Sequence, residues 1–375
     1  SSAASDVYKR QVYTQVSDVE DEVNGLVFRD VNNGVYRAGF AGSQEAYEKA
    51  KNFTRCFVYF IQTQLGMKNL GIADDVFPTE DGMPFIPYHR ESRRIMGEAF
   101  FTMDAAAEPF AFDKPYYRTG IAVGDYAVDH HHFRHPDWKS LPDLEFYPIP
   151  SFNVPMGVII PKQNDVEDLI VAEKSVSVSN LINGATRLQP VVMQLGQAAG
   201  ALAALSVTEL SLIHISENKP VKGIGVRQLQ EALLEAGCYI MPYLDLPKDD
   251  IHFKALQRIG ATGILRGEGR NVGWANQTWF RAGDPLRGED IFVSDIYGGI
   301  RIEPGEISVG RMLELVRSAG GAVPYSAEEE WWNKLGLEDY DRERTALRLE
   351  AAVVIDAAFD PFGVFEVDYN GNFIL

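Results

Sequence analysis

The stretch "DLIVAEKSVSVSNLINGATRLQPVVMQLGQAAGALAALSV", residues 168–207, decides the fold class. Its apolar run Leu169 to Ala172 is typical of a buried strand. Pro190 stands where a long helix is expected to begin, since proline at the first helical position loses no hydrogen bond. Strand, loop and helix in this order indicate an α/β unit whose helix start can stabilise an anion or a developing negative charge. Taken alone, the same pattern also fits an ordinary core unit.

The expected helix carries four small residues on one face. This smooth face would let a backbone or a flat ligand approach closely, whereas each glycine costs about 1 kcal/mol in a helix interior. The four residues are Gly196, Ala199, Gly200 and Ala203.

Two short stretches read as translated adaptor DNA. Residues 1–11 contain "SDVYKRQ", and one DNA sequence that encodes it can be written out. Read on the opposite strand, that DNA contains codons for "LSLIHI", residues 210–215. The DNA also has the form of a sequencing-library adaptor. We therefore interpret residues 1–11 and about 210–216 as adaptor-derived and exclude them from fold reasoning, as one excludes a tag. The native N-terminus is expected to be missing, and His214 is expected to carry no chemistry.

The composition is that of a soluble globular protein with more than one domain. The chain has 375 residues, of which 46% are hydrophobic and 23% charged. A net charge of -18 argues against nucleic acid or an anionic membrane surface as a partner. No membrane span is expected. Cys56 and Cys238 lack the spacing of metal ligands and cannot form a disulfide framework.

Hydrophobic periodicity divides the rest of the chain into a mixed and a helical region. Residues 45–66 predict a helix, and residues 83–160 predict mainly strands, among them "TGIAVGDYAV", "LEFYPIP" and "MGVIIP". Beyond residue 218 four helices are expected. They are 226–237, ending at Gly237; 249–260, capped by Asp249 or Asp250 and ending at Gly260; 307–321; and 344–359.

Five motifs in this order resemble the bacterial FAD-dependent oxidoreductases often labelled xanthan lyase. They are "HRESRRIMGEAFF", "GIAVGDYAVDHHH", "NVPMGVIIPK", "DLIVAEKSVSVSN" and "GATRLQPVVMQLGQAAGALAAL". The resemblance covers residues from about 57 onward. It implies a truncated FAD/NAD(P)-binding fold of the glutathione-reductase type, with a β-rich substrate region, followed by a mainly helical C-terminal domain. The implied activity is hydride transfer between FAD and an unidentified, carbohydrate-related or other small substrate.

The resemblance also implies residue roles. In related flavoproteins an acid after the closing strand binds the ribityl chain, and here that position falls in Ala172, Glu173 and Lys174, with the acid displaced by one place. The segment that would contact the isoalloxazine is Leu188, Gln189, Pro190, Val191 and Val192. Arg187 matches the arginine that faces the substrate in fumarate-reductase-like members, whereas Asn183 replaces their histidine. That replacement puts dicarboxylate reduction in doubt.

Two charged stretches supply the remaining candidate catalytic residues. In "RESRR", Arg90 lies with Ser92 and Arg94 on one strand face and could clamp a polyhydroxylated or anionic substrate; ion pairs at a strand edge are the alternative. In "DHHHFRH", neighbouring histidines point to opposite strand faces, so no metal site is expected. His130 is the candidate general acid or base, and a solvated loop is the alternative.

These inferences divide the chain into successive parts. Residues 1–11 are an adaptor-derived tail, and residues 12–209 are a truncated oxidoreductase domain with a substrate region at about 72–165 and a flavin-proximal strand and helix at 166–209. Residues 210–217 are an adaptor-derived insert or linker, and residues 218–375 form a helical accessory domain. No G-x-G-x-x-G fingerprint follows a strand in this chain, so that motif is expected in the missing part.

A different class of protein remains open as the alternative. The region "YLDLPKDDIHFKALQRIGATGILRGEG" with "WFRAGDPL" resembles an S-layer homology repeat, which would make the chain a non-catalytic cell-wall or glycan attachment module. A glycan or a small molecule is the expected partner in either reading. The compartment is open, with the periplasm or cell envelope favoured.

Overall fold

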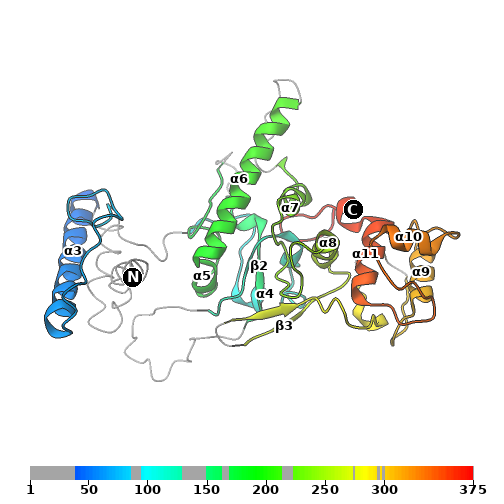
Figure 1. Cartoon of the computed structure of the whole chain (residues 1–375). Helices are drawn as coiled ribbons and strands as arrows, with labels where there is room; N and C mark the ends of the chain where they lie inside the picture. The colour runs from blue at the N-terminus through cyan, green and yellow to red at the C-terminus, as the bar shows by residue number, and fades with distance from the viewer. Residues whose placement is uncertain are drawn as a thin grey trace, which may run out of the picture. The chain divides into compact units, whose positions relative to one another are not determined.

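The computed structural model describes residues 39–85, 94–128, 149–162, 169–212, 223–272, 275–293, 296–297 and 300–374. The chain forms two compact units (Figure 1). Unit 1 comprises Ser1–Arg90 and His130–Asp143, and unit 2 comprises Glu91–Asp129 and Leu144–Leu375. The candidate catalytic residues Arg90 and His130 lie outside the described residues.

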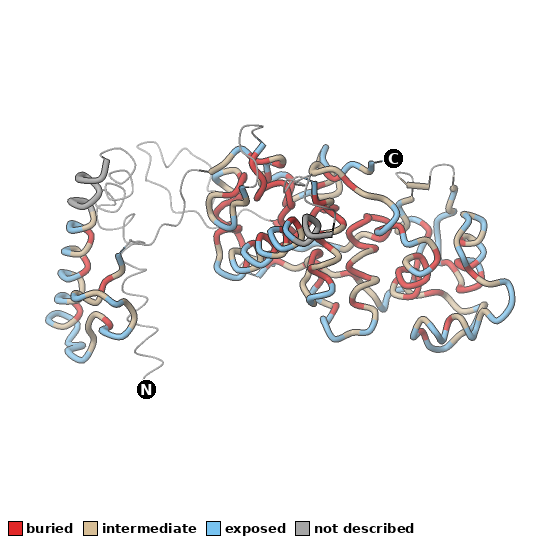
Figure 2. Tube along the Cα trace, turned by 90° about the horizontal axis from the view of Figure 1, so that it is seen from above, coloured by how far each residue is buried: buried red, intermediate tan, exposed pale blue. Residues whose placement is uncertain are grey.

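Unit 1 is built on one long amphipathic helix, α3 (Gly39–Gln64), which confirms the helix predicted over 45–66. Ala50 is buried against Tyr47, Phe53 and Phe57, residues that recur at helical spacing. Tyr59 stays 67% exposed, so the described part of unit 1 has a small core. Buried segments gather instead in unit 2 (Figure 2).

The first half of unit 2 is a two-stranded antiparallel sheet covered by helix α6 (Gln189–Leu212). Strand β1 (Gly120–Gly124) confirms the strand predicted in "TGIAVGDYAV", and it pairs with β2 (Phe152–Pro155). The shorter elements around this sheet are α4 (Met103–Ala107), η2 (Tyr116–Thr119), η4 (Met156–Val158) and α5 (Asn180–Thr186).

Helix α6 packs on β1 through a stripe of apolar residues spaced four, three and four apart. Val191, Leu195, Ala198 and Leu202 are buried, as one face of a helix requires. The side chain of Gln194 fixes the register, because it accepts from the N–H of Val123 at 2.9 Å and donates to the carbonyl of Val123 at 3.0 Å.

The α6 segment Gln189–Val207 is the part of the described chain that is long and apolar enough to cross a membrane, and 33% of that window is buried in unit 2. Because its buried stripe packs against β1, we interpret α6 as a core helix. Its C-terminal half runs beyond the sheet (Figure 1).

The second half of unit 2 is mainly helical, as predicted beyond residue 218. Its core is continuous with that around the sheet, and α8 packs against α11. The elements in chain order are α7 (Val226–Glu235), α8 (Phe253–Thr262), β3 (Glu268–Arg270), β4 (Gln277–Trp279), η6 (Gly288–Asp290), α9 (Val309–Ser318), α10 (Glu328–Lys334), α11 (Arg348–Phe359) and α12 (Pro361–Val364).

Residues 365–373, the closing segment, return from the helical half to the sheet half. The buried Arg118 of η2 donates from Nη1 to the carbonyl of Gly371 at 3.2 Å and lies 4.1 Å from the ring centre of Phe373. The buried Arg227 of α7 donates to the carbonyl of Arg118 at 3.1 Å and to that of Phe365 at 3.4 Å. Two arginines therefore join three distant parts of the chain.

Two predicted strands are wrong. Leu169 to Ala172 form no strand ladder within the described residues, and Leu169 is 46% exposed. Instead, the run is tied to its neighbour by a hydrogen bond from Val171 N–H to the carbonyl of Ile159, at 2.9 Å. The run "MGVIIP" begins with the 3-10 turn η4 because β2 ends at Pro155, and the buried Val158 and Ile160 fill the core from that turn.

Two predicted helix ends also need correction. α8 ends at Gly263, which has φ 81°, whereas Gly260 lies inside the helix, where an added Cβ would stand 2.3 Å from the Tyr243 hydroxyl. The N-cap position is His252, although Asp250 supports the helix start by accepting from the His252 N–H at 2.7 Å. In addition, α6 continues to Leu212, past residue 209, where the predicted oxidoreductase domain ends.

Candidate functional site

A pocket of about 310 Å³ lies where the start of α6 meets the end of β1. We call it the α6 pocket. Leu188, Pro190 and Val191 line it, and they are three of the residues predicted to contact the flavin ring. Its other walls come from Val123 to Tyr126, Ser151 and the connector between α7 and α8, residues 239–244.

The local sequence explains why a helix start faces this pocket. Helix α5 ends at Thr186, Arg187 is its C-cap, and α6 begins two residues later with Pro190 in its first turn. The first turn of a helix leaves backbone N–H groups without partners inside the helix, which carry about half a positive charge together. The α6 pocket therefore lies beside a weakly electropositive helix end.

Gly124 allows β1 to approach α6 closely at this pocket. A Cβ at Gly124 would stand 2.7 Å from a ring carbon of Phe152 and 3.0 Å from a methyl of Val191. The pocket volume is at the lower end of the range for small-molecule sites, which suits a ring system better than a complete dinucleotide. The apolar floor and the helix end fit the ring part of a flavin.

The predicted catalytic residues Asn183 and Arg187 do not line the α6 pocket. Asn183 is fully buried in α5, where its Nδ2 donates to the carbonyl of Lys174 at 3.5 Å and its Oδ1 has no partner within the described residues. Arg187 is 7% exposed, and its backbone N–H donates to the carbonyl of Asn183 at 3.0 Å. These two residues are close to one another but apart from the pocket lining.

The remaining predicted cofactor contacts are also outside the pocket lining. Ala172, Glu173 and Gln189 are exposed, and Lys174 and Val192 are half-buried. Among the described residues no group of three His, Cys, Asp or Glu side chains could hold a metal ion.

Sequence reasoning missed the residues of the opposite wall. Ser151 and Tyr243 are both buried, and burial raises the pKa of the Tyr243 hydroxyl. The Tyr243 ring packs edge-to-face on Phe280, with ring centres 5.2 Å apart. No local pattern marks these positions, because they come from parts of the chain about 90 residues apart that only the fold brings together.

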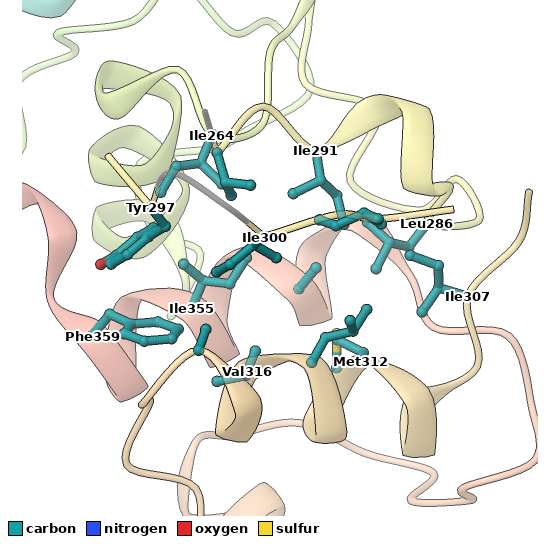
Figure 3. Close-up of a pocket in the computed structure, with 15 residues that line it drawn as sticks. Ile264, Leu286, Ile291, Tyr297, Ile300, Ile307, Met312, Val316, Ile355 and Phe359 are labelled. Atoms are coloured by element: carbon teal, nitrogen blue, oxygen red, sulfur yellow. The ribbon is translucent and has the colours of Figure 1, made fainter. Parts of the chain in front are cut away.

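Another cavity lies within the helical half of unit 2 and is apolar throughout. Its volume is about 50 Å³, and side chains from α9, α11 and the segment between η6 and α9 surround it (Figure 3). Tyr297 is the lining residue with a polar side-chain atom, and its hydroxyl points away from the neighbouring side chains. This cavity has no group that could orient a cofactor or a reacting substrate.

Comparison with known proteins identifies the class. A family model described as FAD dependent oxidoreductase matches residues 5–233, which is more than half of the chain. The protein therefore belongs to the FAD-dependent oxidoreductase family. Membership implies an FAD-binding dinucleotide fold and FAD as the cofactor.

A second similarity is short. Over 47 residues the chain is 51% identical to glutathionyl-hydroquinone reductase YqjG of Escherichia coli (strain K12). The match covers 12% of this chain and 13% of that protein, so the chain spans about an eighth of the length of the relative. No solved structure matches.

Proposed function

We propose that this chain supplies the flavin-ring side and the substrate side of an FAD-dependent oxidoreductase that acts on a small organic molecule. The observation that carries the proposal is the α6 pocket, in which three residues of the predicted ring-contacting segment meet the end of β1. The bound flavin would supply hydride acceptance or donation.

The chain's own residues would orient the ring and stabilise its charge. Leu188, Pro190 and Val191 offer an apolar surface on one side. The N–H groups at the start of α6 favour negative charge nearby, as a flavin acquires on reduction. The side-chain oxygen and the side-chain NH2 group of Gln194 are both hydrogen-bonded to the backbone of Val123. Gln194 would therefore maintain the shape of the pocket and would not contact the ligand.

In unit 2, Arg187 and Asn183 stay the substrate-side residues of the proposal, with Arg187 holding the substrate. The roles predicted from sequence for Arg90, which would also hold the substrate, and for His130, which would take a proton, concern residues outside the described part of the chain. The buried Asn183 has an unpaired Oδ1 within the described residues, which is a polar atom available to a ligand or a bound water.

The α6 pocket can be tested with riboflavin and FAD. Because no dinucleotide fingerprint is present in the sequence, we expect both to bind with a similar Kd, of order 0.1 mM, which corresponds to about 5 kcal/mol. Flavin fluorescence titration measures both constants. Tight, stoichiometric binding of FAD alone would mean that a dinucleotide site lies within this chain and that the α6 pocket is not the main contact.

Substitutions on α6 locate the binding. Leu188→Trp would fill the half-buried edge of the pocket, and it should weaken riboflavin binding by tenfold or more. Met193→Trp is the matched control, since Met193 is 73% exposed and lies outside the lining. Equal affinities for the two variants would refute the assignment.

A further inference from the structure

A second pocket of about 350 Å³ lies on the other side of Ser151 from the α6 pocket. We call it the β2 pocket. Ser151, Pro242 and Tyr243 line both pockets, so the two share one wall. The remaining walls of the β2 pocket are the segment 105–111, the start of β2 and the β3–β4 hairpin.

The lining of the β2 pocket combines aromatic rings with neutral polar groups. Phe110 and Tyr117 pack edge-to-face at 4.8 Å between ring centres, and Phe152 and Tyr243 complete the aromatic surface. The polar groups are Ser151, Asn153 and Thr278. Flat apolar surfaces with a few polar groups select a ring that has apolar faces and polar edges.

The charge of the β2 pocket disfavours an anionic ligand there. Among the described lining residues the charged ones are Asp125 in the α6 pocket and Glu108 in the β2 pocket, both exposed carboxylates. The described lining of neither pocket includes Lys, Arg or His. An anion in the β2 pocket would therefore be repelled by Glu108 and would lack a cationic partner, whereas an uncharged ligand incurs no such cost.

The polar groups differ in what they leave open to a ligand. Asn153 Nδ2 is already taken by the carbonyl of Tyr117 at 2.8 Å and that of Ile240 at 3.1 Å. Thr278 Oγ1 donates to the carbonyl of Ser151 at 3.0 Å. Ser151 itself is 5% exposed, and its Oγ has no hydrogen-bond partner within the described residues. A buried hydroxyl without a partner is unfavourable, and a ligand hydroxyl would supply the missing hydrogen bond.

We propose that the β2 pocket is the substrate subsite of this oxidoreductase and that it binds an uncharged ring carrying hydroxyl groups, with Ser151 as its hydrogen-bonding partner. This inference rests on the proposed function, because the shared wall places the ring beside the flavin pocket. Ser151 lies where a substrate hydroxyl and the flavin ring would come closest.

Methyl glucoside is a suitable probe, with glucuronate as its anionic counterpart. In calorimetric titrations of the full chain without flavin, methyl glucoside should bind saturably, and glucuronate should bind at least tenfold more weakly. Equal binding of both, or of neither, would overturn the proposal.

Three variants assign the binding to this pocket. Ala107→Phe would fill the β2 pocket from its lining and should abolish saturable binding, whereas Ala204→Phe, at an exposed position of α6 outside the lining, should not change it. Ser151→Ala should weaken methyl glucoside binding about tenfold while leaving thermal stability equal or higher. A more stable Ser151→Ala protein with unchanged affinity would mean that the hydroxyl serves no ligand.

The two proposals fail in different ways. If Ala107→Phe loses methyl glucoside but still binds riboflavin, both are supported. If neither the unchanged chain nor Leu188→Trp binds riboflavin but both bind methyl glucoside, the flavin assignment of the α6 pocket fails. The assignment of the β2 pocket to an uncharged hydroxylated ring is then still supported. If riboflavin binds and methyl glucoside does not, the β2 pocket assignment alone fails.

Discussion

Glu328, at the start of α10, accepts hydrogen bonds from three side chains of the helical half. The donors are Arg317 of α9, Tyr340 and Arg342. The side chains of Glu328 and Arg317 are 11% and 9% exposed, so little solvent screens this group. Burial raises the pKa of Glu328, but the three hydrogen bonds outweigh it and lower the pKa to about 2.

Glu328→Gln should lower the free energy of unfolding by about 2–4 kcal/mol at pH 7, because two arginines would lose their anionic partner. In the unfolded chain Glu328 has a pKa of 4.5, above its folded pKa of about 2. The unfolded state therefore binds the proton first on acidification, and the stabilisation is lost as pH falls from 4.5 towards 2.

Urea unfolding at several pH values measures the difference in the free energy of unfolding between wild type and Glu328→Gln. Glu329→Gln is the control, since Glu329 is the exposed neighbour. A difference between wild type and Glu328→Gln that stays constant down to pH 2, or one that Glu329→Gln reproduces, would contradict the role given to Glu328.

At the scale of elements, α6 combines a buried stripe with an open face. A Cβ added at Gly196 or Gly200 would meet no atom within 4 Å among the described residues. By contrast, a Cβ at Gly97 would stand 2.6 Å from the Gly157 carbonyl oxygen and 2.7 Å from the Ser177 Cβ. A methyl group therefore has room at Gly196 and Gly200 but none at Gly97.

Gly196→Ala should therefore raise stability by about 1 kcal/mol, because alanine is the better helix former and nothing obstructs its methyl group. Gly97→Ala should lower stability by at least as much, since backbone atoms would have to move. Thermal unfolding followed by circular dichroism compares the two. No gain for Gly196→Ala would indicate that another surface packs on this face of α6.

The longer helices were predictable from sequence, whereas the short helices α4, α5, α10 and α12 and several strands were not. Helices α7, α9 and α11 repeat apolar residues over ten positions or more and end at caps, so local sequence determines them. A short apolar run such as Leu169 to Ala172 fits a strand, a turn or a loop equally well, and only its neighbours decide. Among the residues that line the α6 pocket, Leu188, Pro190 and Val191 were named from their motif, whereas only the fold shows that Ser151 lies beside them.

At the scale of the whole molecule, the buried Arg118 and Arg227 connect the closing segment to the rest of unit 2. Arg227 donates from its side chain to Gln230 at 2.8 Å as well as to three backbone carbonyls, and it lies 4.3 Å from the ring centre of Phe362. A lysine has one ammonium group and cannot reproduce this planar fork of donors.

Arg227→Lys should thus destabilise unit 2 by about 2–4 kcal/mol, because buried carbonyls would lose their donors. Arg311→Lys is the control, since the Arg311 side chain is 59% exposed on α9. Limited proteolysis with detection of fragments cut within the closing segment, residues 365–373, measures the loosening. Equal cleavage of the two variants would show that Arg227 does not hold the segment.

The hydrogen bond between Arg118 and Gly371 joins residues 253 positions apart, which has a consequence for synthesis on the ribosome. The sheet half emerges early but cannot acquire its last partner until residues 365–373 have left the exit tunnel. During that interval apolar side chains of β1, β2 and α6 are exposed to solvent, where they can aggregate or bind a chaperone. A translational pause before residues 365–373 have emerged would therefore lengthen the period in which the sheet half can aggregate.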